Sequence, residues 1–429
     1  MTSKPATGKA PPKAPPKRRS LFAVLGPGLV TGAADDDPSG IGTYSQVGAQ
    51  FGYGLAWTMF FGFPLLASIQ AICAQIGAVT GRGIAQNLRQ HYPRALLQVV
   101  VMLLLIANVI NLGADLGAMA AALALLVPGP LLLYTFVFGL VSVALEVFVS
   151  YNRYVSVLKW ATLSLFAYVA VVFVAGVPLG EAVRDTLVPT FTFDKPHTMA
   201  LVAIFGTTIS PYLFFWQAGQ EVEEQHRRHV KPLCVSPRTA GRELGRIRVD
   251  TLVGMAFSHM TALFIIVATA ATLHAHGITD VASADQAAEA LRPIAGDLAF
   301  ALFALGIIGT GLLAVPILAG SAAYAVSETF GWTEGLDRKP REAKAFYGVI
   351  AVATLAGVAL NFIGIDPMKA LYWAAVVNGL LAPPLMIITM LIARNPKAMG
   401  ALIISRPLAI GGWISTFVMV LVAAVFLLV

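Results

Sequence analysis

Long apolar stretches, separated by short polar or basic segments, follow one another along almost the whole chain. About 20 apolar residues in an α-helix are enough to cross the hydrocarbon core of a bilayer. The pattern therefore predicts eleven membrane-spanning helices, at residues 21–50, 55–79, 95–126, 130–149, 155–177, 198–225, 249–273, 298–330, 345–362, 368–392 and 408–429.

The first predicted span contains three adjacent acids, Asp35, Asp36 and Asp37, followed by Pro38. As a helix, the half from residue 21 to 34 is ~21 Å long, which places the acids well inside the bilayer. One aspartate at a helix centre costs roughly 3 kcal/mol, so three are tolerated only around a cation or a water-filled cavity. Pro38 and the nearby glycines also free backbone carbonyls at this depth. We predict a broken helix with a cation-binding site.

The sixth span, 198–225, has a similar interruption, because Thr207, Thr208 and Ser210 precede Pro211. Breaks at corresponding positions indicate a transporter site between two inverted repeats. The predicted fold is an all-α membrane protein with an inverted 5+5 repeat, broken helices 1 and 6 and a cytoplasmic N-terminus. Its parts are a basic tail at 1–20, one repeat at 21–177, the other at 198–392 and a peripheral helix at 408–429.

Composition and charge agree with this prediction. The 429 residues are 57% hydrophobic and 12% charged, with a mean hydropathy of +0.77, which is typical of a multi-pass protein of the cell membrane. With the N-terminus inside, 25 of the 29 Lys and Arg residues lie in the tail or in inward loops, as the positive-inside rule requires. The net charge of +7 is explained in this way. No nucleic-acid partner is predicted, and the oligomeric state is left open.

Several motifs resemble the Nramp (natural resistance-associated macrophage protein) family of divalent-metal transporters. They are the Gly26-Pro27-Gly28 opening, the aspartate–proline pair ten residues later, the two breaks among eleven spans, and the small residues from Ala319 to Tyr324. The resemblance implies the fold of sodium-coupled amino-acid symporters and alternating access around a metal at the two breaks. It implies a transported metal ion and no cofactor. The spans contain no nucleophile–base arrangement or phosphate loop, so no enzymatic activity is predicted.

The chain departs from the family pattern at two motifs. The family's Asp-Pro-Gly-Asn reads Asp37-Pro38-Ser39-Gly40 here, so the liganding aspartate is kept and Gly40 replaces the liganding asparagine. The family's Met-Pro-His reads Ser210-Pro211-Tyr212, which removes a thioether and an imidazole. The family's carbonyl-donating alanine corresponds to Thr207, and Asn378 in span ten faces the site by the same resemblance.

Loss of the thioether favours harder ions, since carboxylate, hydroxyl, carbonyl and water ligands suit Mg²⁺, Ca²⁺ and Mn²⁺. The chain therefore resembles the magnesium-transporting branch of the family, and we predict transport of partly hydrated Mg²⁺ and also of Mn²⁺. By the same resemblance, proton-coupled members of the family relay protons through acids in span three, the histidine of span six and arginines in span nine. Here Asn111 and Asp115 of span three stand at positions shifted from that pattern, and span 345–362 has no arginine, so tight proton coupling is not predicted. The alternatives are a proton-coupled Mn²⁺/Fe²⁺ transporter and, third, a sodium-coupled symporter of organic solutes.

Each candidate residue also has a structural interpretation. Asp37 could cap the second half-helix, and the hydroxyls near Pro211 could bond back into their own helix. Past the second break, Gln217 and Glu221 could line an inner gate, whereas Glu223 and Glu224 are expected at a solvated helix end. The predicted metal-binding residues are Asp35, Asp36, Asp37, Gly40, Thr207, Thr208, Ser210 and Asn378.

Overall fold

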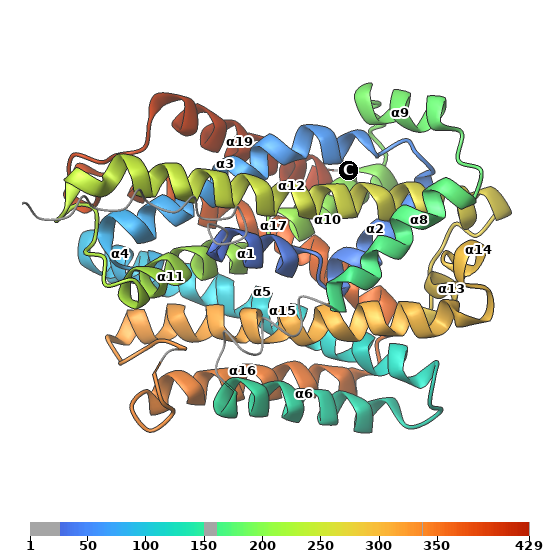
Figure 1. Ribbon diagram of the computed structural model, residues 1–429, viewed down its shortest axis with the longest axis horizontal. Coiled ribbons are helices and arrows are strands. Elements are labelled where there is room, and N and C mark those ends of the chain that lie inside the picture. Colours follow the sequence, from blue (N-terminus) through green and yellow to red (C-terminus); the bar gives the residue numbers. More distant parts are fainter. Residues whose placement is uncertain (1–25, 150–160, 337, 429) are drawn as a thin grey trace, which may run out of the picture.

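The computed structural model describes residues 26–149, 161–336 and 338–428, which form a bundle of helices without any strand in these ranges (Figure 1). Within them, nine helical segments are long and apolar enough to cross a membrane, or ten if the bent pair at Leu163–Val174 and Leu179–Leu187 is one span. The predicted tail at 1–20 lies outside the described residues.

The helices of the first half are α1 (Pro27–Asp35), α2 (Pro38–Phe51), α3 (Trp57–Thr80), α4 (Ile84–His91), α5 (Arg94–Ala124), α6 (Leu131–Phe148), α8 (Phe166–Val174) and α9 (Leu179–Leu187). Those of the second half are α10 (Lys195–Thr208), α11 (Pro211–Arg227), α12 (Ala240–Thr272), α13 (Ala284–Glu289), α14 (Arg292–Ala295), α15 (Ala299–Phe330), α16 (Lys344–Leu360), α17 (Pro367–Ala393), α18 (Pro396–Met399) and α19 (Arg406–Leu428).

The predicted membrane helices agree with these elements, with α1 and α2 together in the place of the first. One boundary prediction is wrong: α12 begins at Ala240, not at residue 249, because the basic segment before the apolar run continues the helix. Part of the fifth predicted span, 155–177, lies outside the described residues. The short helices α4, α9, α13, α14 and α18 were not predicted from the apolar pattern.

Both predicted breaks are confirmed. Asp36 and Asp37 separate α1 from α2, and Ile209 and Ser210 separate α10 from α11. In each case a proline occupies the first position of the second half-helix, where its fixed φ is suitable and its missing N–H is not needed. The proline prevents continuation of the preceding helix, so each span is divided at the proline.

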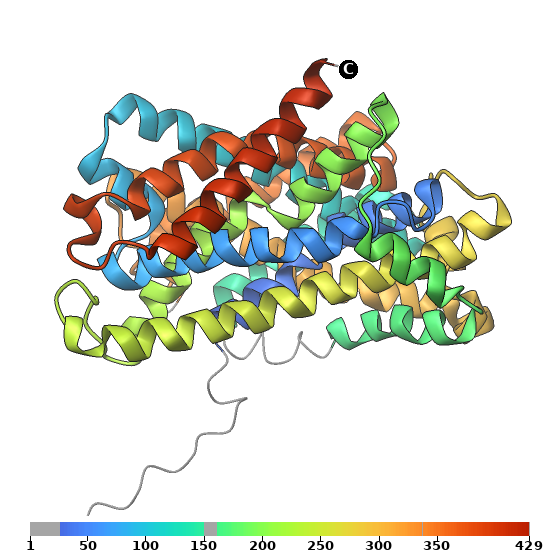
Figure 2. The same cartoon turned by 90° about the horizontal axis from the view of Figure 1, so that it is seen from above.

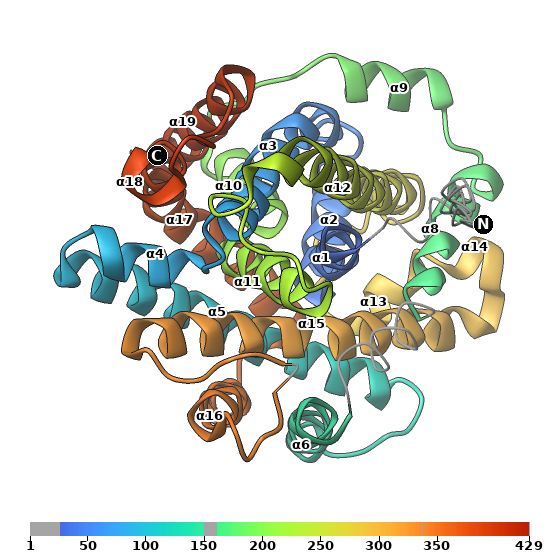
Figure 3. The ribbon, with the colours of Figure 1, turned by 60° about the vertical axis from the view of Figure 1, so that its left-hand side comes forward.

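The half-helix α1 packs directly against α12 in the interior of the bundle (Figure 3). A Cβ at Gly32 would lie 2.2 Å from the carbonyl oxygen of Gly254, and one at Gly254 would lie 2.1 Å from that of Gly28. Only glycine fits at such a backbone-to-backbone contact, which is the role of small residues four apart in membrane helices. This contact explains Gly28 and Gly32 of the first span.

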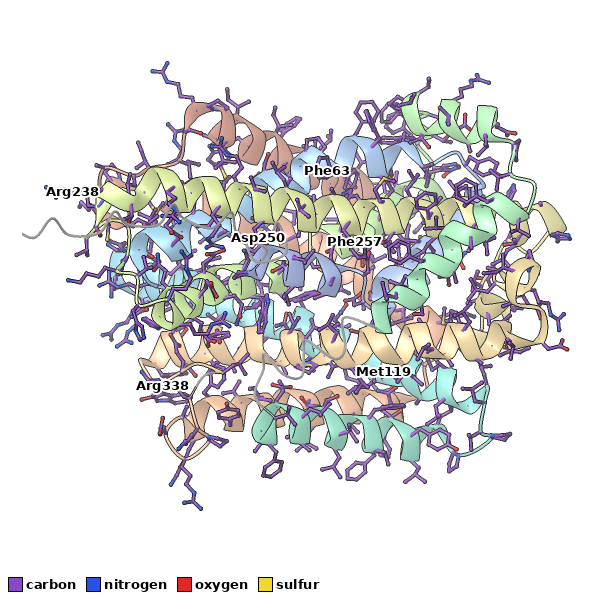
Figure 4. The ribbon with its side chains drawn as sticks, viewed as in Figure 1. Phe63, Met119, Arg238, Asp250, Phe257 and Arg338 are labelled. Carbon is purple, nitrogen blue, oxygen red and sulfur yellow. The ribbon has the colours of Figure 1, made fainter. Side chains whose placement is uncertain are left out.

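Burial separates the interior from the lipid-facing helices. The apolar window of α10–α11 is 89% buried inside the protein, whereas that of α6 is 22% buried and that of α19 is 28% buried. Figures 1 and 3 accordingly show α6 and α16 at the outside, and Figure 2 shows α19 across the outer side of α3. Arg238 and Arg338 lie at one end of the bundle (Figure 4), which the positive-inside rule assigns to the cytoplasm.

Candidate metal site at the helix breaks

Asp37 lies at the centre of a buried hydrogen-bond network at the first break. Its carboxylate caps α2 by accepting from the backbone N–H of Gly40 at 2.7 Å. It also accepts from the side-chain amide of Asn111 at 3.1 Å and from the hydroxyl of Tyr212 at 3.3 Å. The capping role considered from the sequence is therefore present, and the other contacts bring α5 and α11 to the same carboxylate.

Helices α5 and α17 extend this network with oxygen-bearing side chains. Asn111 also donates to Asp115 at 3.3 Å, and Asp115 accepts from the backbone N–H of Ser39 at 3.2 Å. The side-chain oxygen of Asn111 accepts from Asn378 at 3.1 Å. Asp37 and Asp115 are thus two buried carboxylates that share one amide donor, and Asn378 is connected to Asp37 through Asn111, by two successive hydrogen bonds.

At the second break, the hydroxyls of Thr208 and Ser210, predicted as ligands, bond to carbonyls of α10. Thr208 donates to Ile204 at 2.9 Å, and Ser210 donates to the carbonyls of Gly206 at 2.9 Å and Thr207 at 2.7 Å. This is the structural alternative considered for both residues. The Thr207 carbonyl retains a second lone pair for a further partner.

Tyr212 connects the two breaks. Besides Asp37, its hydroxyl contacts the carbonyl oxygen of Ala34 at the end of α1 at 3.0 Å, and its own carbonyl accepts from Ser321 of α15 at 3.0 Å. The sequence had not singled out Tyr212 as a site residue. The available signal was its position directly after the proline of the second break.

The three adjacent aspartates face two different neighbourhoods. Asp35 accepts a hydrogen bond of 2.5 Å from Ser258 of α12. The hydroxyls of Ser258 and Thr261 also face Asp36, but neither carboxylate oxygen of Asp36 has a hydrogen-bond partner among the described residues. Asp35 and Asp36 therefore point toward α12, whereas Asp37 points toward α5 and α11. Gly40 contributes its N–H, and a Cβ there would lie 3.5 Å from a carboxylate oxygen of Asp37.

Four buried acids near the breaks, Asp35, Asp36, Asp37 and Asp115, have no ion pair with a basic side chain in the described part of the chain. Within the same ranges, no three His, Cys, Asp or Glu side chains converge closely enough to hold a metal by themselves. Uncompensated buried carboxylates cost several kcal/mol each, on the order of the desolvation penalty of an ion. The arrangement therefore needs protons or an external cation with its own water.

On the cytoplasmic side, Asp250 of α12 fastens the beginning of α1. Its carboxylate accepts from the backbone N–H groups of Gly26 and Gly28 at 2.8 Å and of Leu29 at 3.2 Å. An acid is favourable at this position because the N-terminus of a helix carries a partial positive charge and free N–H groups. Figure 4 shows Asp250 on the side of α12 nearest α1.

Further contacts tie α11 to the same place. Arg246 donates to the buried carboxylate of Glu221 at 2.7 Å and lies 3.9 Å from Asp250. Thr31 of α1 donates to Gln217 of α11 at 2.5 Å. The residues considered as an inner gate, Gln217 and Glu221, thus join α1, α11 and α12 into one closed cytoplasmic contact.

The expectation of a solvated helix end is wrong for Glu223. This side chain is 7% exposed and accepts from the hydroxyl of Tyr324 and, at 2.7 Å, from the backbone N–H of Leu336. The reason is that α15 and the segment after it cover this face of α11. Glu224, by contrast, is partly exposed and pairs with Arg227 at 2.8 Å.

On the opposite side, a cavity of about 610 Å³ opens between α2, α10 and α17. Gly42 and Gln46 of α2 form part of its lining, together with Tyr372 of α17. Leu371 contacts Gly42 and accepts at its carbonyl from the hydroxyl of Ser39 at 3.2 Å. This fully buried leucine therefore lies between the outer cavity and the network around Asp37.

Comparison with known proteins is consistent with this architecture. The family model "Natural resistance-associated macrophage protein-like" matches residues 28–429. The divalent metal cation transporter MntH of Klebsiella pneumoniae (strain 342) is 26% identical over 416 residues, covering 94% of this chain and 93% of that protein. The protein of the same name from Deinococcus radiodurans is 24% identical over 416 residues, covering 94% and 88%.

Solved structures share the fold. A crystal structure of the Eremococcus coleocola manganese transporter superimposes with a TM-score of 0.76 at 17% identity, covering 96% of this chain and 87% of that one. Mhp1, a nucleobase-cation-symport-1 family transporter, superimposes in a closed conformation with a TM-score of 0.59 at 16% identity, covering 94% and 92%. The predicted inverted-repeat fold with broken helices is thereby confirmed.

Proposed function

Because this chain belongs to the Nramp family, whose model matches nearly all of it, we propose that it is a secondary transporter of divalent metal cations that works by alternating access. We propose Mg²⁺ that keeps part of its water shell as the main substrate, with Mn²⁺ as a second one. The observation that carries this proposal is the buried network of oxygen ligands around Asp37, in which no basic side chain neutralises the acids among the described residues.

The chemistry of the available groups supports a hard ion. The side chains around Asp37 offer carboxylate, amide and phenol oxygens, from Asp115, Asn111, Asn378 and Tyr212. Magnesium prefers oxygen ligands, dehydrates reluctantly and is usually held by one or two carboxylates with several waters. The absence of three converging protein ligands in the described ranges is compatible with such an ion and unfavourable to a fully dehydrated one.

In this proposal Asp37 is the direct carboxylate ligand, and the Thr207 carbonyl and Asn378 contact the ion or its water. Asp35 and Asp36 add negative potential from the α12 side of the break. Thr208, Ser210 and Gly40 shape the break through their hydrogen bonds and small size. The structure offers no basic side chain of α16 beyond Lys344 at its first position, which favours uptake driven by the membrane potential, worth ~2.3 kcal/mol per charge per 100 mV.

The test is uptake into proteoliposomes that contain a Mg²⁺ dye or a Mn²⁺ dye, with an internal pH dye alongside. We expect both metals to enter without matched acidification, and Asp37→Asn to abolish entry. Asp280→Asn, which removes an acid from the outer cavity, is the matched control for lost charge and should retain most uptake. Entry of Mn²⁺ without Mg²⁺ would contradict the hydrated-ion proposal, and full activity of Asp37→Asn would remove Asp37 from the site.

A second candidate is proton-coupled transport of Mn²⁺. It is favoured by the buried acids Asp35, Asp36 and Asp115, which could carry protons in place of a metal, and by the relatives described above as metal and manganese transporters. Acidification of the vesicle interior in proportion to Mn²⁺ entry would select this candidate. The similarity to Mhp1 concerns the fold alone, and carboxylates at the break disfavour an anionic organic substrate.

A further inference from the structure

Two lysines line the mouth of the outer cavity. Lys195 is the first residue of α10, and Lys369 lies in the first turn of α17. Both side chains belong to the lining of the cavity of about 610 Å³ that leads toward Gly42 and the network around Asp37. If a divalent cation enters from this side, it passes between two ammonium groups.

Neither helix stability nor membrane orientation explains these lysines. A basic residue at a helix N-terminus opposes the helix dipole, which favours acids there. Positive charge on the outer side also opposes the positive-inside rule, and Lys195 and Lys369 are two of only four basic residues outside, with Arg184 and Arg292. Both lysines are exposed, so they are not held there by packing.

Among the described residues, the acids near the mouth form no ion pair with these lysines. Asp194 caps α10 by accepting from the N–H of His197 at 2.8 Å, and its pKa is lowered by this bond and by the His197 ring. Asp366 caps α17 by accepting from the N–H of Met368 at 2.9 Å. Asp280 is the only acid in the described lining of the cavity. These bonds orient the carboxylates toward their own helices but leave their negative charge in place, so an ion in the mouth meets both the acids and the two ammonium groups.

We propose that Lys195 and Lys369 form an electrostatic barrier that limits the rate at which divalent cations enter the outer cavity. This inference rests on the proposed function, since it concerns the substrate of that site. Repulsion by a fixed positive charge is twice as strong for a divalent ion as for a monovalent one. Because salt screens exposed charges, the difference in uptake between the wild type and a variant without these lysines should shrink as ionic strength rises.

The test compares initial Mn²⁺ uptake by the wild type and the double variant Lys195→Gln/Lys369→Gln in proteoliposomes, in choline chloride. Since two positive charges are removed from the ion's path and the screening length is about 30 Å at 0.01 M, we expect about threefold faster uptake by the variant. At 0.5 M salt the two proteins should differ by less than about 1.3-fold, since the screening length falls to a few ångströms.

The matched control is Arg184→Gln/Arg292→Gln, which removes the same charge from the outer side but from α9 and α14, outside the cavity lining. It should match the wild type at both salt concentrations. Equal uptake by the lysine variant and the wild type at low salt, with the wild type active, would overturn the barrier while leaving the proposed function intact. Slower uptake by the lysine variant would also overturn it and would indicate that the lysines attract an anionic metal complex. A wild type that carries no divalent metal would instead refute the proposed function.

Discussion

The contact between Asp250 and the start of α1 yields a quantitative prediction for Asp250→Asn. The carboxylate accepts three backbone N–H groups, two of them at 2.8 Å and one at 3.2 Å. Asparagine keeps the shape but has one acceptor oxygen and no charge, so at least one charge-assisted bond, worth about 1.5–3 kcal/mol, and the dipole interaction, about 1 kcal/mol, are lost. We expect the closed cytoplasmic contact to weaken by about 3 kcal/mol, a shift of roughly 100-fold in its equilibrium with an open state.

Thiol labelling measures this shift. Thr31 of α1 is fully buried and faces Gln217, so Thr31→Cys reports on separation of α1 from α11. The native thiols are replaced in this background by Cys73→Ala and Cys234→Ser. With a charged, membrane-impermeant reagent on the cytoplasmic side, labelling should be slow in this background and much faster after Asp250→Asn is added.

A second capping aspartate provides the control for this experiment. Asp366 caps α17 at the outer end of the bundle, with bonds of 2.9 Å and 3.4 Å to the N–H groups of Met368 and Lys369. Asp366→Asn removes a comparable cap without touching α1 and should leave labelling slow. If Thr31→Cys is labelled equally slowly with and without Asp250→Asn, then Asp250 does not hold α1 in the closed cytoplasmic contact.

Three further outcomes are expected. Tyr212→Phe removes the hydroxyl that joins the two breaks. Because the lost hydrogen bonds contribute ~1.4 kcal/mol, the KM for Mn²⁺ uptake should rise about tenfold, and an unchanged KM would contradict this. Gly254→Val should lower the melting temperature in detergent, since a side chain there meets the backbone of Gly28 and overpacking costs about 1–3 kcal/mol; an unchanged melting temperature would show that α1 shifts freely. Burial and the charges of Glu328 and Glu223 raise the pKa of Glu334 to about 9 from 4.5, so the free energy of unfolding should fall as pH rises through this range, and Glu334→Gln should reduce that slope in a pH series of thermal melts.

The sequence predicted the breaks because proline and glycine act locally. Pro38 and Pro211 each follow a cluster of small polar residues, and this combination predicts a break. A proline alone does not, since Pro64 and Pro316 lie inside the continuous helices α3 and α15. The glycines near Gly28 allow close packing of helices. The different directions of Asp35 and Asp37 could not be predicted in this way. Residues at a break do not have helical backbone angles, so their spacing in the sequence does not predict which neighbouring helix each side chain faces.

Long-range partners were also beyond the sequence. Asp250 lies at the start of an apolar run, and its partners Gly26, Gly28 and Leu29 are more than 220 residues away in the chain. Glu223 looked like part of a charged helix end, and only its packing against α15 shows that Tyr324 satisfies it. Local composition predicts which polar groups lie within the membrane, whereas the fold determines which hydrogen-bond partners they have.

These contacts make α1 a nine-residue helix that is held separately at each end. Asp250 holds its cytoplasmic end, Gln217 and the glycine contacts with α12 hold its middle, and Tyr212 holds the carbonyl of Ala34 at its inner end. The single hydroxyl hydrogen of Tyr212 is shared between Ala34 and Asp37, so an ion that takes Asp37 as a ligand changes the bond that Tyr212 makes to the inner end of α1. We therefore expect metal occupancy of the site to be linked to release of α1 from the cytoplasmic contact. If the two ends of α1 move independently, Tyr212→Phe and Asp250→Asn should change metal affinity in opposite directions. Equal changes in affinity and in Thr31→Cys labelling for both variants would show that α1 moves as one rigid body.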